Sequence, residues 1–245
     1  MRRKEWDASF IEGDVDMEKV IQEIKIISLP MPLKLGRVNC YLIDTGSGLV
    51  LIDTGGANAR RELESALVEA GCKPGNLRLI VITHGDFDHT GNAAYLRSKY
   101  GSKIGMHPDD AGMAERGDMF WNRKTGSRLF RMLARLLFRF GKDNRFTADI
   151  SLKDGDHLGE YGLEGTVLSI PGHSKGSIGI LTGAGDLVCG DLFDNTHTPV
   201  LNAIMDELES AHGSVAKLSQ FTINTVYPGH GKPFHMEDYS FANQV

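Results

Sequence analysis

The chain has 245 residues, which is long enough to bury a full core in one domain or at most two. Apolar residues make up 41% of the sequence and charged residues 24%, the usual balance of a soluble globular protein. The formal net charge of −5 argues against a chain that binds nucleic acid or anionic membranes through its overall charge. We therefore expect no nucleic-acid partner.

The N-terminus and the cysteines exclude further classes of protein. Residues 1–4 are basic, but acidic residues interrupt the segment that follows, so no apolar signal-peptide core is present. No apolar run is long enough to cross a bilayer, and we expect a cytoplasmic protein. Cys40, Cys72 and Cys189 are odd in number and widely spaced, which predicts neither a disulfide framework nor a cysteine metal site.

In the first half of the chain, short apolar runs predict strands and amphipathic runs predict helices. A helix over residues 59–70 is ended by Gly71 and Pro74, and a helix over 90–100 has Thr90 or Asp88 as its cap. The predicted strands cover residues 24–29, 38–44, 49–53, 77–82 and 103–106, with a hairpin around 45–48 and a further helix from Asp109.

Residues 116–145 interrupt this alternation, with nine basic residues against two acidic ones. Basic and apolar side chains there recur at helical spacing on opposite stripes, which predicts an amphipathic helix within an insertion over residues 110–147. Three roles fit the helix: packing on the domain or on a second subunit of a homodimer, a lid that offers cations to an acidic substrate, and contact with a membrane surface. The basic stripe consists of Arg128, Arg131, Arg135, Arg139 and Lys142.

Strands alternate with helices again in the second half, as expected for a four-layer αββα sandwich. We find no sequence repeat or linker, and we expect a single domain over residues 1–245. The predicted strands cover residues 148–152, 166–170, 178–181, 187–189 and 222–226, and a helix covers 203–218.

The densest group of potential metal ligands lies in residues 83–91, between the strand over 77–82 and the helix that follows. His84, Asp86, Asp88 and His89 fall within six residues, on a strand-to-helix turn. If His84 and Asp86 are still extended, strand alternation places both on the same side, while Asp88 and His89 diverge at the turn. The sequence therefore predicts that one short loop can hold two ions.

Three later segments each place one more ligand-type residue beside glycine at the end of a predicted strand. His173 lies in residues 171–177, Asp191 follows Cys189 and Gly190, and His230 lies in residues 227–231. Glycine at such positions lets backbone approach a site closely. We expect Cys189 itself to be a small core residue.

These motifs resemble the metallo-β-lactamase fold superfamily in order and context, from Asp53-Thr54-Gly55 to His230, over about residues 24–234. The resemblance implies an α/β (α+β) fold of the four-layer αββα type, here with a basic helical insertion. The common motif of the family is His-x-His-x-Asp-His, and this chain has Asp86 in place of the second histidine. Flavodiiron proteins of the superfamily also carry a carboxylate there, as glutamate.

The resemblance implies a site for two divalent metal ions, with Asp53 as a support behind the ligands. Zinc is the first expectation, but the hard carboxylate of Asp86 shifts the preference toward iron or manganese. Three carboxylates and a hydroxide offset two divalent ions, whereas a histidine at position 86 would leave one net positive charge. The implied ligands are His84, Asp86 and His173 for the first ion, Asp88, His89 and His230 for the second, and Asp191 between them.

The expected function is that of a dinuclear metal-dependent hydrolase, in which a metal-bridging hydroxide attacks an ester, thioester, lactone or phosphodiester. Asp88 and Asp191 are the expected catalytic carboxylates, and the sequence has no G-x-S-x-G nucleophile motif. Asn195, His197 and Trp121 are candidate contacts for a small-molecule substrate. Two alternatives remain open: a diiron redox module of the flavodiiron type without its flavin domain, and a metal-binding regulator with little turnover.

Overall fold

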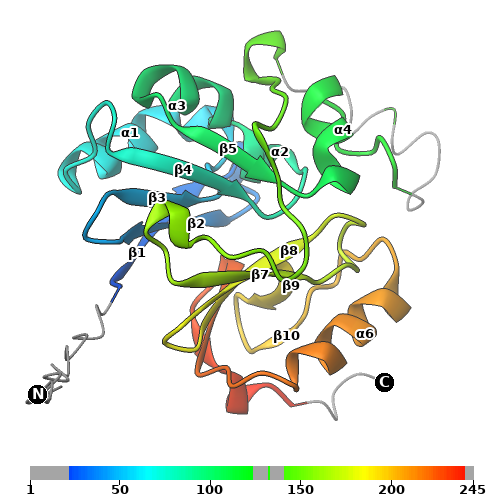
Figure 1. The fold of residues 1–245 in the computed structure, drawn as a ribbon. Coiled ribbons are helices and arrows are strands. Elements are labelled where there is room, and N and C mark those ends of the chain that lie inside the picture. Colours follow the sequence, from blue (N-terminus) through cyan, green and yellow to red (C-terminus); the bar gives the residue numbers. More distant parts are fainter. Residues whose placement is uncertain (1–21, 124–131, 133–140, 241–245) are drawn as a thin grey trace, which may run out of the picture.

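A computed structural model describes residues 22–123, 132 and 141–240. Two β-sheets face each other, and helices cover their outer sides (Figure 1). The helix predicted from the basic stripe falls outside the described residues, apart from Met132 and Lys142. Lys142 begins the short 3-10 helix η3 (Lys142–Asn144).

The first sheet has six strands in the order β1-β2-β3-β4-β5-β6. β1, β2 and β3 pair antiparallel, with the predicted hairpin between β2 and β3. From β3 to β6 the strands are parallel, so the carboxyl ends of β3 and β4 meet at one edge of the sheet. The strands are Ile24–Pro30, Arg37–Asp44, Leu49–Ile52, Leu77–Ile82, Lys103–Met106 and Ile150–Ser151.

The second sheet has the order β12-β11-β9-β8-β7, with β10 on β9. β9 and β11 run parallel, and the other neighbours pair antiparallel. The strands β7 to β12 are Gly165–Ser169, Ile178–Thr182, Asp186–Asn195, Val200–Leu201, Thr225–Gly231 and Phe234–His235.

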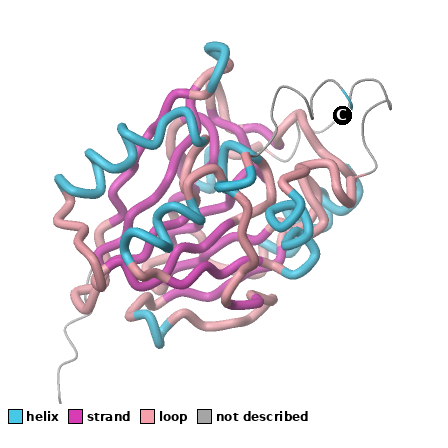
Figure 2. The backbone as a smooth tube through the Cα atoms, turned by 90° about the horizontal axis from the view of Figure 1, so that it is seen from above, coloured by secondary structure: helices cyan, strands magenta, loops and turns pink. Residues whose placement is uncertain are grey.

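The buried side chains form three clusters, one between each pair of layers. Alternate residues of β4 belong to two different clusters. Ile80 and Ile82 face the helices α1 (Arg60–Glu69) and α3 (Ala93–Tyr100), whereas Leu79 and Val81 face the second sheet. A third cluster lies between the second sheet and α6 (Leu208–Leu218). These clusters explain why the strands are apolar on both faces. The order of layers is αββα, and the predicted fold is confirmed (Figures 1 and 2).

Several predicted boundaries were wrong. The helix over 90–100 is two helices, α2 (Phe87–Thr90) and α3, and neither Asp88 nor Thr90 is an N-cap, because α2 follows Asp86 directly and α3 follows Asn92. The helix α4 (Pro108–Arg116) begins near the predicted position. α6 begins at Leu208 rather than at residue 203.

The second sheet also differs from the prediction near the site. Asp191 and His230 were expected after their strands, but β9 and β11 continue through both residues. The register between the strands shifts around Pro228, and Gly190 has a positive φ of 51°. The glycines therefore mark an irregularity within paired strands rather than the end of pairing.

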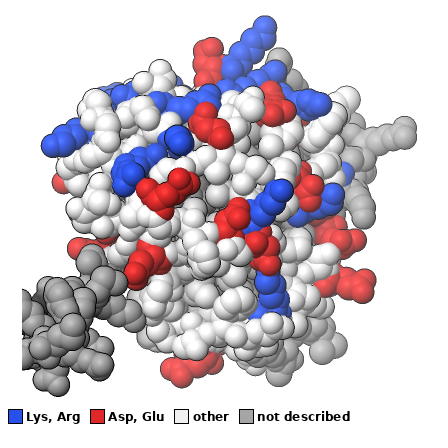
Figure 3. Space-filling model, viewed as in Figure 1, with Lys and Arg blue, Asp and Glu red and all other residues white. Residues whose placement is uncertain are grey.

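On the face shown in Figure 3, acidic and basic side chains are interspersed. Among the described residues, no helix has both the length and the apolar character that a membrane span requires.

Candidate metal centre

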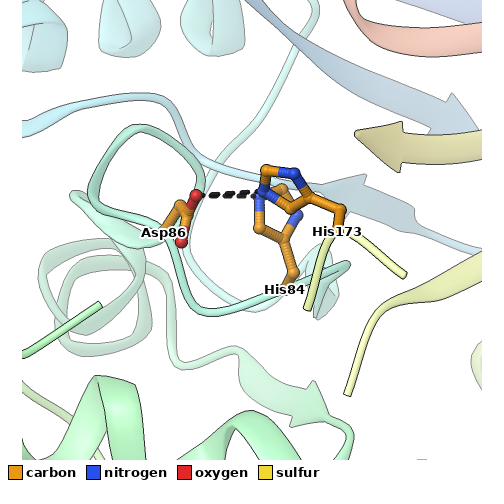
Figure 4. A group of neighbouring side chains, drawn as sticks. All are labelled: His84, Asp86 and His173. Atoms are coloured by element: carbon orange, nitrogen blue, oxygen red, sulfur yellow. Dashed lines mark hydrogen bonds and ion pairs between the residues drawn. The ribbon is translucent and has the colours of Figure 1, made fainter. Parts of the chain in front are cut away.

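The first three ligand-type side chains meet where β4 leaves the sheet. His84 and Asp86 lie on the bend between β4 and α2, and His173 lies on the loop after β7. Asp86 Oδ2 is 3.1 Å from His173 Nε2 and 3.7 Å from His84 Nε2. The three side chains point toward one another, so the predicted first group is assembled (Figure 4).

The second group forms on the other side of the same loop. Asp88 and His89 belong to α2, and His230 comes from β11. Asp88 Oδ2 lies 3.5 Å from His230 Nε2 and 3.9 Å from His89 Nε2. One short helix therefore supplies two ligand-type residues, and the His89 ring lies 4.0 Å from the His84 ring, so the two groups adjoin.

Asp191 lies between the two groups. Its Oδ1 is 3.4 Å from His89 Nε2, and its Oδ2 is 3.4 Å from His230 Nε2. The same Oδ2 is 3.8 Å from His173 Nε2 and 3.9 Å from His84 Nε2. The structure thus brings all seven predicted ligand residues into one buried cluster.

Each of the four imidazoles has a hydrogen-bond partner on its Nδ1, away from the cluster. His173 Nδ1 donates to the Ile204 carbonyl at 2.6 Å, and His230 Nδ1 donates to the Arg37 carbonyl at 2.7 Å. Since the Thr83 hydroxyl donates to Asp53, it accepts from His84 Nδ1, at 2.9 Å. A proton held on Nδ1 leaves the Nε2 lone pair for the cluster, the arrangement in which histidine ligates metals.

Asp53 has the supporting position that the resemblance implied. Its Oδ2 lies 2.8 Å from His89 Nδ1, and its carboxylate also accepts from the backbone N–H and hydroxyl of Thr83. Asp53 holds a positive φ of 60°, a backbone conformation that costs an aspartate free energy. The hydrogen bonds to Thr83 and His89 offset that cost and hold His89 in place.

The residues present fit a metal. His84 Nε2, His89 Nε2 and Asp191 Oδ1 are buried polar atoms without a hydrogen-bond partner. Each such atom costs roughly 1–3 kcal/mol if nothing binds it. Imidazole nitrogen and carboxylate oxygen are both ligands of divalent ions, and an ion among them would satisfy all three atoms.

The charges of the cluster shift the pKa values of its members in opposite directions. Burial, together with the nearby His89 and His173, lowers the pKa of His84 well below its ordinary value. Burial acts in the same sense on His230, but the Asp191 carboxylate outweighs it and raises the pKa of His230 to about 9. Burial raises the pKa of Asp88. Without an ion, then, His230 holds a proton that a metal has to displace.

Glycine is required where β11 passes the cluster. A Cβ on Gly229 would lie 2.1 Å from Asp191 Oδ1 and 2.9 Å from the His89 ring. Real atoms do not approach so closely, so any larger residue would have to displace Asp191 or His89.

Sequence reasoning missed two buried charged residues beside the cluster. Arg123 Nη2 lies 2.7 Å from Asp86 Oδ1. Asp110 accepts hydrogen bonds from the Gly85 backbone, the Ser174 hydroxyl and the Gly176 backbone, at 3.0, 2.5 and 2.8 Å. Only the basic composition around Arg123 gave a signal, and it was assigned to an exposed stripe.

The predicted substrate contacts lie outside the ligand groups. Asn195 ends β9 and donates its side-chain amide to the Lys232 carbonyl, and His197 is exposed on the next loop. Trp121 is 50% exposed, and its ring lies against the Arg116 guanidinium. The three cysteines are buried and unpaired, and Cys189 lies in the core as predicted.

The sequence and the fold were compared with those of known proteins. A sequence model of the family described as the metallo-beta-lactamase superfamily matches residues 33–230. The chain is 27% identical to the probable metallo-hydrolase YqjP of Bacillus subtilis, over 86% of this chain and 72% of that protein. It is 30% identical to the hydroxyacylglutathione hydrolase GloC of Haemophilus influenzae over 62% of this chain, but spans only 64% of GloC.

Among solved structures, a similar fold occurs in TTHA1623, which was solved in a di-iron-bound form. The TM-score is 0.67 at 25% identity, over 88% of this chain and 98% of that one.

Proposed function

Because the chain belongs to the metallo-beta-lactamase superfamily, we propose that it is a dinuclear metal-dependent hydrolase of a small-molecule ester, thioester, lactone or phosphodiester. One observation carries the proposal. Asp191 lies within 4 Å of four imidazole nitrogens from two separate ligand groups, and the buried atoms of the cluster include three that lack a partner. A single ion, in any one of the overlapping groups, would leave several of the seven ligand-type residues unused.

In this proposal, His84, Asp86 and His173 hold the first ion, and Asp88, His89 and His230 hold the second, with Asp191 shared. Bound divalent ions supply a water of near-neutral pKa and polarise the substrate's carbonyl or phosphoryl oxygen. The chain positions the ligands. Hydrogen bonds from the Nδ1 atoms to Asp53, Ile204 and Arg37 fix three of the imidazole rings, and burial of the site excludes bulk water.

Asp88 and Asp191 are the proposed catalytic carboxylates. Asp88 is the proposed acceptor of a proton from the attacking water, and in the metal-free chain burial raises the pKa of its carboxyl group. Asp191 keeps its negative charge, because His230 and His89 lower its pKa well below the ordinary value despite burial. In this proposal Asp88 accepts a proton, whereas Asp191 stays ionised between the two ligand groups.

Zinc is the metal we propose first, since four imidazoles surround the cluster. Asp86 favours iron or manganese more than a histidine would, and TTHA1623 was solved with two irons. The same features favour a diiron redox module as the second candidate. Hydrolysis ranks above it because GloC and YqjP are both described as hydrolases.

The likeness to GloC, which is named a hydroxyacylglutathione hydrolase, supports a thioester substrate. We therefore place thioesters first in the panel of substrates. Asn195, His197 and Trp121 stay our candidates for substrate contact, and the basic stripe stays a candidate for attracting anionic groups.

Elemental analysis of the purified protein, paired with a panel of esters, thioesters, lactones and phosphodiesters, tests the proposal. The expected result is two ions per chain and turnover that a chelator abolishes. His173→Ala and His230→Ala should each lose about one ion, whereas the exposed His157→Ala should lose none. Two irons with oxygen or nitric oxide reduction and no hydrolysis would favour the redox candidate. Retention of both ions in either ligand variant would refute the dinuclear assignment.

A further inference from the structure

Arg123 reaches the metal centre from the turn after α4. Its side chain is 4% exposed, and its Nη2 meets Asp86 Oδ1 at 2.7 Å. The turn itself is held in place, because Phe120 is buried and the Asn122 amide donates to the Asp109 carbonyl. The cation therefore lies in the described part of the site and is separate from the predicted basic stripe, which begins at Arg128.

The two oxygens of Asp86 face different partners. Oδ1 faces Arg123, whereas Oδ2 faces His173 Nε2 at 3.1 Å and His84 Nε2 at 3.7 Å. An ion held with His84 and His173 would thus meet only one oxygen of Asp86. The carboxylate is restricted to the role of a single-atom ligand, which is what an imidazole provides.

The net charge of the Asp86–Arg123 pair also equals that of a neutral imidazole. The carboxylate of Asp86 adds one negative charge where the common family motif has a neutral imidazole, and the Arg123 guanidinium adds one positive charge beside it. We propose that Asp86 and Arg123 together act as a neutral, single-atom ligand unit for the first metal ion, with Arg123 as the positioning residue. The inference rests on the dinuclear centre proposed above and assigns Arg123 a role in setting its charge and metal selectivity.

The pair predicts effects of opposite sign for its two members. Arg123→Met leaves an extra negative charge and frees Oδ1, so the first site should bind metal more tightly and favour harder ions such as manganese. Asp86→His leaves a buried cation beside the metal, so the first site should bind more weakly. Asp86→His with Arg123→Met restores both charge and ligand atom count, so its affinity should return toward that of the parent protein.

The experiment measures zinc and manganese dissociation constants of the first site by chelator competition in a double-mutant cycle. We expect Arg123→Met to tighten zinc binding and Asp86→His to weaken it, each by at least about tenfold, and the double variant to lie within about threefold of the parent. The absorption spectrum of bound cobalt reports ligand changes separately from affinity. Arg116→Met is the matched control, since Arg116 lies in the same segment but stacks on Trp121.

A purely structural Arg123 gives a different pattern. Arg123→Met would then weaken metal binding or leave it unchanged, and the double variant would be no better than Asp86→His; either result overturns the proposal. If Arg123→Met cannot be purified, zinc binding that is at least about threefold tighter in the double variant than in Asp86→His decides the matter alone. Every readout is metal binding, so loss of hydrolysis with the expected affinities would refute the hydrolase function and not the ligand unit.

Discussion

Replacing Asp110 should disconnect the two loops that carry the first metal group. Its carboxylate joins Gly85, which lies between His84 and Asp86, to Ser174 and Gly176, which follow His173. Asp110 is fully buried, so its carboxylate supplies these hydrogen bonds in place of bulk water. Both ligand loops therefore depend on this one side chain for their relative position.

The magnitude follows from the groups left behind. Asp110→Ala strands two backbone N–H groups, at roughly 1–3 kcal/mol each, while Ser174 keeps its hydrogen bond to Ser177. Burial raises the pKa of Asp110, so holding the carboxylate ionised already costs free energy and reduces the net loss. We expect Asp110→Ala to destabilise the metal-free protein by about 2–4 kcal/mol. Zinc affinity of the first site should fall about 10–100-fold, as for other residues that orient ligands.

Urea unfolding in the presence of a chelator, followed by zinc competition, measures both effects. Asp110→Asn keeps one acceptor and should fall between the parent and Asp110→Ala. The neighbouring Asp109 is a matched control, because its side chain is 41% exposed and pairs only with the exposed Lys175 at 3.4 Å among the contacts described. Asp109→Ala should cost at most about 1 kcal/mol. An equal loss for Asp109→Ala and Asp110→Ala would refute the reasoning.

Three further predictions concern other parts of the site. Gly229→Ala should lower the metal content to fewer than two ions per chain in elemental analysis, because its methyl group would displace Asp191 or His89; full occupancy would contradict the close approach. The metal-free protein should lose stability as the pH rises from about 6.5 to about 9, because the folded-state pKa of His230 lies above its ordinary 6.5, and urea unfolding of His230→Gln should show a flatter profile. Replacing Arg128, Arg131 and Arg135 by glutamine should raise KM for anionic substrates at unchanged metal content, and identical kinetics for charged and neutral substrates would leave packing or membrane contact as the role of the stripe.

The fold was predictable because its signals are local. The strands of the first sheet are mostly short apolar runs, and both faces of β4 are buried, so its sequence is apolar except for Arg78. The ligand-type residues were also predictable, since His84, Asp86, Asp88 and His89 fall within six positions. The predicted ends of several elements were wrong. A glycine indicates a turn, but it does not show whether the strand stops there or continues through a bulge, as at Gly190.

Arg123 and Asp110 were missed for a different reason. Nothing in the local sequence separates Arg123 from the arginines that follow it, since burial depends on a turn whose side chains pack against residues far apart in the chain. Asp110 has an acidic neighbour, Asp109, yet only one of the two is buried. Long-range contacts decide which of two adjacent carboxylates supports the site, and they carry no periodicity in the sequence.

Arg123 changes the argument about the metal. From the sequence, Asp86 added one negative charge and therefore shifted the preference toward iron or manganese, with zinc still the first expectation. With the guanidinium 2.7 Å from its Oδ1, that charge is offset within the protein, and the selectivity expected from the ligand alone becomes smaller. The pKa of Asp86 is consistent with this pairing. Burial raises this pKa, but Arg123 and His173 lower it by more, so that it lies well below its ordinary value. The effect of a charged ligand on metal selectivity in a buried site therefore depends on the nearest opposite charge. For Asp86 that charge belongs to Arg123, which lies 37 positions away and outside every metal-ligand motif.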